Sequence, residues 1–312
     1  MDALYIVLLF MALLIPGFIL GKLKLLQDGA AVSLSNILMY VAMPFLVFVK
    51  LLDINFRAIG WLPIAVSAIL PILLSFLLPL IGKYLCRAED GKKRAAIFCA
   101  AFPNCGFLGI PLAAAMFPEK PEIILYISIF NVVSTFLLLT LGIYILSGDK
   151  RKIDLKKTLI SPICIAMLLG IIASLCHVKA HAPYVYSFSE TLAQLCTPLS
   201  MIALGYELSK MQPLNMWKSL DVYAVALIRL LLSPLFAFLI LLLLKFGLHL
   251  NVDSSLAFAM MIATAVSTAA SAPAMTKKYE LDSEYTAALT LVNTLLFTLT
   301  LPLTYLAFNA VF

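Results

Sequence analysis

Charged residues are scarce in this chain. They make up 12% of the 312 residues, whereas hydrophobic residues make up 63%. An ordinary soluble domain carries about 25% charged residues, because its surface needs a polar coat. The scarcity of charge therefore excludes a soluble globular domain. Apolar runs long enough to cross a hydrocarbon core of about 30 Å recur along the whole chain.

The apolar runs lack centrally placed carboxylates and histidines. No Asp or Glu lies at the centre of a run, and the three histidines fall in the connections between runs. An intramembrane enzyme needs a carboxylate pair, a Ser–His pair at depth or an H-E-x-x-H motif. We therefore expect no catalytic residue, no metal site and no cofactor. H+ or Na+ stays open as a coupling ion, although the missing carboxylates disfavour a carboxylate relay.

Apolar runs separated by polar breaks predict an all-α integral membrane protein with about ten transmembrane helices. The longest charged connector, 148–157, is too short to form a soluble domain. The expected spans are residues 3–21, 33–52, 60–85, 93–117, 122–147, 158–177, 187–209, 219–246, 254–276 and 284–309.

Lys and Arg residues are concentrated in alternate connections. Of the 22, 16 follow the odd-numbered spans and 5 follow the even-numbered spans. The positive-inside rule places the first set in the cytoplasm, so both termini are expected outside. The net charge of +6 is therefore a sign of topology, and we expect no nucleic-acid partner.

The two halves of the chain resemble each other. Pro71 matches Pro234 at a shift of 163 residues, and Asn131 matches Asn293 at a shift of 162. Because each half has five spans, the second half starts from the opposite side of the membrane and the repeat is inverted. Inverted repeats exchange conformations and open a central site to each side in turn, which predicts a secondary transporter. The expected boundaries are 1–147 for the first repeat, 148–157 for a cytoplasmic connector and 158–312 for the second repeat.

The fourth span is interrupted at its centre. Pro103, Gly106, Gly109 and Pro111 fall within nine residues there, and each proline removes an amide donor and clashes with the preceding turn. Freed backbone groups are tolerated at bilayer depth only where they face protein or a watery cavity. The second half-helix then presents its N-terminus, whose partial positive charge favours an anion. We expect Asn104 to contact the substrate there; a kinked helix packed through its glycines is the alternative.

The ninth span carries the counterpart of this segment. At a shift of 162 residues it reads Val266, Ser267 and Thr268, and small or hydroxylated residues continue to Pro273. Such residues allow another backbone to approach closely. Two broken helices that cross at the centre would bring Asn104 beside these hydroxyl groups. Ordinary packing of small residues is the alternative.

The stretch from Asn104 to Leu112, read as N-C-G-F-L-G-I-P-L, resembles the N-x-G-F-x-G-x-P-L motif of the auxin efflux carrier family. That family includes the plant PIN carriers and bacterial malonate, malate and oxalate permeases. Residues 197–208, 274–279 and 293–302 are also similar to it, so the resemblance covers the full length. Members of the family often have a proline in the ninth span where this chain has Val266, so the helix breaks either at Val266 or nearer Pro273.

The resemblance implies the fold shared with bile-acid symporters. Spans 1, 2, 6 and 7 would form a scaffold, and spans 3–5 and 8–10 a moving core. Helices 4 and 9 would cross as broken helices at the substrate site. The resemblance also implies a homodimer and an elevator-like movement of the core.

Arg229 is the one Lys or Arg that falls deep in an expected span. A buried cation is costly and often functional. It either attracts a carboxylate substrate, or snorkels or pairs with a carbonyl group or Glu207. The repeat-related Asn131 and Asn293 either line the site or form hydrogen bonds between helices.

These features predict a secondary active transporter that moves a small organic carboxylate, such as malate or malonate, by alternating access. We expect a lipid-embedded, multi-pass homodimer of the bacterial inner or plasma membrane. A channel or uniporter for small anions is the alternative, because broken helices also line pores. The residues expected to bind substrate are Asn104, Gly106, Ser267, Thr268, Asn131, Asn293 and Arg229. The residues expected to shape the crossing or bend the scaffold are Pro103, Gly109, Pro111, Val266, Pro273, Pro44 and Pro198.

The orientation can be tested by cysteine labelling. In a cysteine-free background, a membrane-impermeant thiol reagent added outside should label Lys120→Cys and Lys179→Cys but not Lys152→Cys, because only the first two belong to the connections poor in basic residues. Labelling after membrane disruption serves as the control for reactivity. The reverse pattern in intact cells would overturn the topology.

Overall fold

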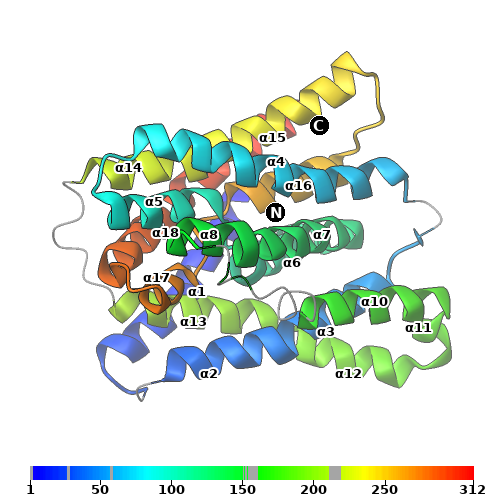
Figure 1. The fold of residues 1–312 in the computed structure, drawn as a ribbon. Helices are drawn as coiled ribbons and strands as arrows, with labels where there is room; N and C mark the ends of the chain where they lie inside the picture. The colour runs from blue at the N-terminus through cyan, green and yellow to red at the C-terminus, as the bar shows by residue number, and fades with distance from the viewer. Residues whose placement is uncertain are drawn as a thin grey trace.

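The computed structural model describes residues 3–26, 29–56, 59–149, 151, 153, 161–210 and 219–312. Within these ranges the chain is helical and contains no β-strand. Most of the connector 148–157, including Lys152, lies outside the described residues. The helices run largely side by side along one direction (Figure 1). The prediction of an all-α protein is confirmed.

Helices occupy each of the first five expected spans. A π-helical turn, Leu38–Ala42, joins α2 to α3, and another, Leu138–Gly142, joins α7 to α8. These helices are α1 (Ala3–Lys22), α2 (Ala30–Ile37), α3 (Met43–Leu52), α4 (Trp61–Leu85), α5 (Asp90–Ala101), α6 (Ile110–Met116), α7 (Pro121–Leu137) and α8 (Ile143–Ser147).

Helices likewise occupy the expected spans of the second half. One π-helical turn, Leu227–Leu232, interrupts the eighth span without ending it, and a second, Leu243–Gly247, forms its last turn. The helices are α10 (Pro162–Leu175), α11 (Val178–His181), α12 (Pro183–Ala193), α13 (Cys196–Lys210), α14 (Leu220–Ala226), α15 (Ser233–Leu242), α16 (Ser254–Ala265), α17 (Ala272–Lys278) and α18 (Ser283–Asn309).

Several helices have the length and composition of membrane spans. Five in the described residues are long and apolar enough to cross a bilayer: Val32–Leu52, Trp61–Leu85, Pro121–Ser147, Leu220–Gly247 and Ser283–Asn309. Large apolar side chains also face outward; on α10 these are Ile165, Leu168, Leu169 and Ile172, which share one helical face. Exposure of such large apolar faces to water is unfavourable, so these faces contact lipid.

The helices form two groups. In the first, called the scaffold group, α1 packs along α13, and α3 packs against α10 and α12. In the second, called the core group, α4 packs against α5 and α7, α16 against α7 and α15, and α18 against α5 and α14. Figure 1 shows α2, α3, α10, α12 and α13 along the lower side and α4, α14, α15 and α16 along the upper side. This division follows the scaffold and core that the family resemblance implies.

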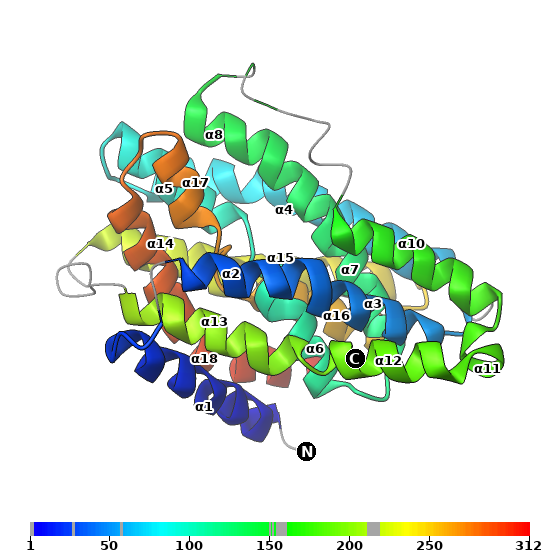
Figure 2. The ribbon, with the colours of Figure 1, turned by 90° about the horizontal axis from the view of Figure 1, so that it is seen from below.

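Two glycines let α1 and α13 approach closely within the scaffold group (Figure 2). A Cβ atom on Gly17 would lie 2.0 Å from the carbonyl oxygen of Ile202, and one on Gly205 would lie 2.1 Å from that of Leu14. Both neighbours are backbone atoms, which cannot move aside cheaply. The contact therefore requires glycine at both positions.

Gly205→Ala should destabilise the protein, because the added methyl group would force α1 and α13 apart. We expect a loss of about 1–3 kcal/mol, the usual range for overpacking, read as a lower melting temperature in detergent. Gly60→Ala is the matched control, since the nearest atom to its Cβ would be Pro63 Cδ at 3.8 Å. Equal melting temperatures for the two variants would contradict the close packing of these helices.

Candidate functional site

The fourth span breaks after Ala101, where α5 ends. Phe102 is extended, with φ −106° and ψ 119°. The chain becomes helical again in a π-helical turn, Cys105–Gly109, that leads directly into α6. Pro103 lies in the extended part, where its missing N–H breaks no helical hydrogen bond. Pro111 lies in α6 directly after this π-helical turn, inside the half-helix Cys105–Met116, where its missing N–H leaves one carbonyl of the preceding turn without a helical partner.

The ninth span breaks at Val266, which is extended with φ −64° and ψ 155°. The preceding helix α16 ends at Ala265, and the following helix α17 begins at Ala272 with Pro273 in its first turn. The break therefore starts at Val266, and Pro273 marks the point at which the second half-helix begins. A proline is not required at the break, because extended backbone is open to valine as well.

The two breaks cross and pair with each other. The backbone N–H of Asn104 donates to the carbonyl of Ser267 at 2.7 Å, and that of Ala269 donates to the carbonyl of Phe102 at 2.9 Å. Pro103 and Thr268 face each other in this short antiparallel bridge. Each break thus satisfies backbone groups that the other leaves free, which a nonpolar interior requires.

The hydroxyl groups of the ninth break strengthen the crossing. Thr268 Oγ1 donates to the carbonyl of Cys99 at 3.0 Å, and Thr294 Oγ1 donates to Ser267 Oγ at 3.2 Å. Ser267 and Thr268 are fully buried and do not line a cavity. The sequence predicted both residues at the crossing, where they lie, but both form hydrogen bonds within the protein and neither is exposed to the cavity.

A cavity of about 460 Å³ lies between the scaffold and core groups beside the crossing. Scaffold residues from α2, α3, α13 and the start of α10 form one wall. Core residues from α7, α17 and both breaks form the other. Of the residues expected to bind substrate, Asn104, Gly106 and Asn131 line this cavity, together with Pro103.

Asn104 lines this cavity and carries an unpaired hydrogen-bond donor. Its side chain is 3% exposed, and its Nδ2 has no hydrogen-bond partner among the described residues. The backbone carbonyl of Asn104 accepts hydrogen bonds from the N–H groups of Leu108 and Gly109 at 3.1 and 3.2 Å, so the half-helix begins at Asn104. Gly106 follows, and a Cβ atom there would meet Asn131 Oδ1 at 3.3 Å. The site therefore offers an amide donor at a helix N-terminus, a combination that suits an anion.

Arg229 binds the C-terminal ends of both first half-helices. Its side chain is fully buried, and Nη1 donates to the carbonyl of Ala101 at 3.1 Å while Nη2 donates to that of Thr264 at 2.6 Å. Nη2 also donates to Ser233 Oγ one turn along its own helix. Helix C-termini carry partial negative charge, which the guanidinium group neutralises. Arg229 is absent from the cavity lining, so this geometry matches the carbonyl-pairing alternative.

The other expected residues lie outside the cavity lining. Asn293 Nδ2 donates to the carbonyl of Leu289 at 2.9 Å within its own helix, Oδ1 has no partner among the described residues, and the side chain lines no cavity. Gly109 faces Ile127, to which a Cβ atom would approach at 3.3 Å. Pro44 follows a π-helical turn at the start of α3, and Pro198 lies in the first turn of α13.

Sequence reasoning missed the scaffold wall of the cavity. On α13 this wall consists of Ser200, Ala203, Leu204 and Glu207. Their spacing of three, one and three residues puts them on one helical face. Ser200 and Glu207 are polar residues on one face of an expected membrane span, a signal that could have identified this wall.

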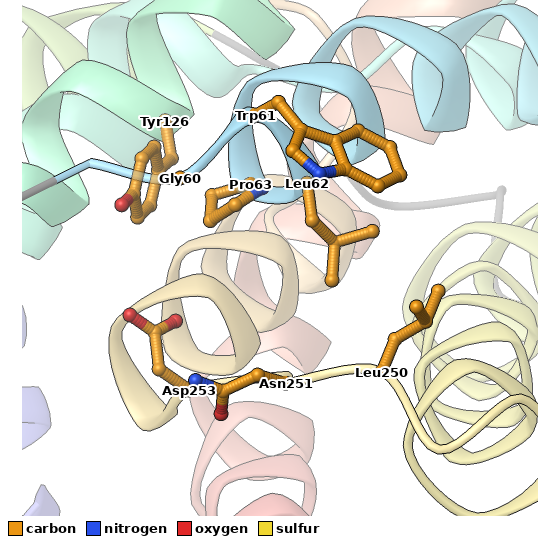
Figure 3. A pocket seen from close by; sticks show the side chains of 8 residues that line it. All are labelled: Gly60, Trp61, Leu62, Pro63, Tyr126, Leu250, Asn251 and Asp253. Atoms are coloured by element: carbon orange, nitrogen blue, oxygen red, sulfur yellow. The ribbon is translucent and has the colours of Figure 1, made fainter.

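A smaller cavity of about 300 Å³ lies at the other end of α7, between the start of α4 and residues 250–253 (Figure 3). Tyr126 and Asp253 face it, and Trp61 forms its rim. Asp253 Oδ1 already accepts from the N–H of Leu256 at 2.9 Å, which caps α16. This cavity contains no residue of either break and is therefore separate from the crossing.

A helical membrane protein in which two broken helices cross beside a central cavity has the architecture of a secondary transporter. A family model described as "Membrane transport protein" matches residues 3–158 and 150–305. The chain belongs to this family of membrane transport proteins, which confirms the resemblance to auxin efflux carriers. Because the family consists of transporters, the intramembrane-enzyme alternative is rejected.

Two archaeal proteins are similar to the chain along most of its length. An uncharacterized transporter of Methanocaldococcus jannaschii is 29% identical over 269 residues, which cover 82% of this chain and 86% of that protein. An uncharacterized transporter of Methanothermobacter thermautotrophicus is 28% identical over 311 residues, 95% of each chain. Both agree with the family, and neither name states a substrate.

Arg229→Met should lower the melting temperature of the ligand-free protein, because it leaves the carbonyls of Ala101 and Thr264 without their buried donor. We expect a loss of about 2 kcal/mol or more, since each buried unsatisfied group costs about 1–3 kcal/mol. Arg87→Met is the matched control at an exposed side chain. If Arg229→Met melts like the wild type and loses only ligand binding, Arg229 contacts substrate instead.

Proposed function

We propose that the chain is a secondary transporter that moves a small organic carboxylate anion across the plasma membrane by alternating access. The observation that carries this proposal is the unpaired Nδ2 of Asn104 at the cavity wall. A buried amide donor without a partner is costly, so a ligand that accepts hydrogen bonds would relieve the cost. A carboxylate group is such a ligand.

The electrostatics of the cavity favour the same class of ligand. The half-helix Cys105–Met116 points its N-terminus at Asn104, and its first amides are not consumed by helical hydrogen bonds. No Lys or Arg is among the described residues that line the cavity. Positive potential therefore comes from backbone and side-chain amides, which can bind an anion and still release it.

The packing supports two inverted repeats with boundaries 1–147 and 158–312. The pair α1 and α13 unites spans 1 and 7, and the pair α3 and α10 unites spans 2 and 6. Spans 1 and 2 of the first repeat correspond to spans 6 and 7 of the second. If each span is replaced by its counterpart, the pair of spans 1 and 7 becomes the pair of spans 6 and 2. Two breaks at equivalent places, in spans 4 and 9, obey the same exchange. Such symmetry supplies the two alternative conformations that alternating access needs.

We propose that the cavity opens towards the cytoplasm, which corresponds to an inward-facing state. Its lining residues Val32, Ser161 and Met275 lie beside the connections rich in Lys and Arg, which we place in the cytoplasm. At the opposite end Lys50 Nζ of the scaffold group donates to the carbonyl of Pro118 in the core group at 3.2 Å. We propose that the core group carries the site past the scaffold group, within a homodimer whose termini lie outside.

Small carboxylates should raise the melting temperature of the purified protein, because a ligand that binds only the folded state stabilises it by mass action. Asn104→Ala should remove that shift while leaving the ligand-free melting temperature close to wild type. Asn251→Ala, in the smaller cavity, is the matched control and should keep the shift. We would test malonate, malate and oxalate, then measure uptake of any binder into proteoliposomes.

Other outcomes would each contradict a different part of the proposal. A shift by amines or neutral solutes, with none by carboxylates, would remove the carboxylate assignment and leave the transporter fold intact. A carboxylate shift that survives in Asn104→Ala would place the site elsewhere. Flux that does not saturate with concentration would indicate a channel.

A further inference from the structure

Glu207 is the single ionisable side chain among the described residues that line the cavity. It belongs to α13 in the scaffold group, on the face that also carries Ser200 and Leu204. The opposite wall holds Asn104, whose amide donor is free. The cavity lining thus contains both the amide of Asn104, a donor suited to a carboxylate ligand, and the carboxyl group of Glu207.

No described residue forms a hydrogen bond or salt bridge with Glu207. Lys210, one turn later on α13, lies with its Nζ 4.5 Å from the centre of the Tyr206 ring. Helices α1, α2 and α6 and two π-helical turns pack against α13. The titratable groups that these elements carry, none of which lines the cavity, are Tyr5, Lys22, Tyr40 and Cys105.

An ionised Glu207 would oppose the binding of an anionic substrate. Two negative charges in one cavity repel each other, and the repulsion grows as the surroundings become less polar. None of the described residues that line the cavity is a cation that would offset it. A protonated Glu207 removes the repulsion and provides an O–H donor that a carboxylate ligand can accept from.

We propose that Glu207 is a proton-binding site that couples proton uptake to the binding of the anionic substrate. A proton from water on the cavity side bonds to one carboxylate oxygen of Glu207, and it leaves when the anion leaves. No bond of the substrate is made or broken. This inference rests on the proposed carboxylate substrate and adds the coupling ion, for which the sequence offered no site.

The test compares the affinity for malonate as a function of pH in the wild type, Glu207→Gln and Glu190→Gln. Binding linked to one proton should weaken about tenfold for each pH unit above the pKa of the linked group. Glutamine resembles the protonated carboxyl group, so Glu207→Gln should bind malonate with little dependence on pH. Glu190 is exposed on α12 and outside the cavity, so Glu190→Gln should follow the wild type.

An infrared measurement keeps protonation separate from folding and affinity. Addition of malonate at a pH where Glu207 is ionised should increase the carbonyl band of a protonated carboxyl group in the wild type and not in Glu207→Gln. An unchanged band, or a pH profile that Glu207→Gln shares with the wild type, would contradict the proposed role of Glu207 and leave the proposed substrate unaffected. Failure of all variants to bind any carboxylate at any pH overturns the proposed substrate and this coupling together.

Discussion

Backbone groups released by two interrupted helices are buried at the centre of this protein, and they bind each other. Asn104 pairs with Ser267, and Phe102 pairs with Ala269. Arg229 donates hydrogen bonds to the carbonyl groups of Ala101 and Thr264, at the ends of the half-helices that lead into the crossing. Because each unsatisfied group would cost several kcal/mol in a nonpolar medium, the two breaks stabilise each other and neither would be stable alone. The crossing therefore places both halves of the chain relative to one another.

The rest of the site depends on this arrangement. When the carbonyl ends are neutralised and the extended segments are paired, the N-terminus of the half-helix Cys105–Met116 and the side-chain amide of Asn104 remain available at the cavity. The core group carries these donors, and the scaffold group forms the facing wall with Glu207. A site divided between two groups of helices changes its access when the groups move relative to each other, which links the crossing to transport.

Sequence patterns predicted both helix breaks but not the contacts of the side chains within them. Pro103 and the glycines after it predicted a break in the fourth span, and a shift of 162 residues predicted the partner segment at Val266, Ser267 and Thr268. Both are local patterns, and the structure has breaks at both places. The pattern could not decide whether a serine hydroxyl would face a ligand or a neighbouring helix. Ser267 turned inward because Thr294 of α18 lies within hydrogen-bonding distance.

The sequence by itself determined the membrane class, the approximate spans and the positions of the breaks, because hydrophobicity, proline and glycine act over a few neighbouring residues. Only the tertiary structure decided the partners of Arg229 and the wall on which Glu207 lies. Those partners are far apart in the chain: Arg229 binds Ala101, 128 residues away. A buried charge or amide takes its role from whichever group packs against it, and packing is a property of the assembled helices.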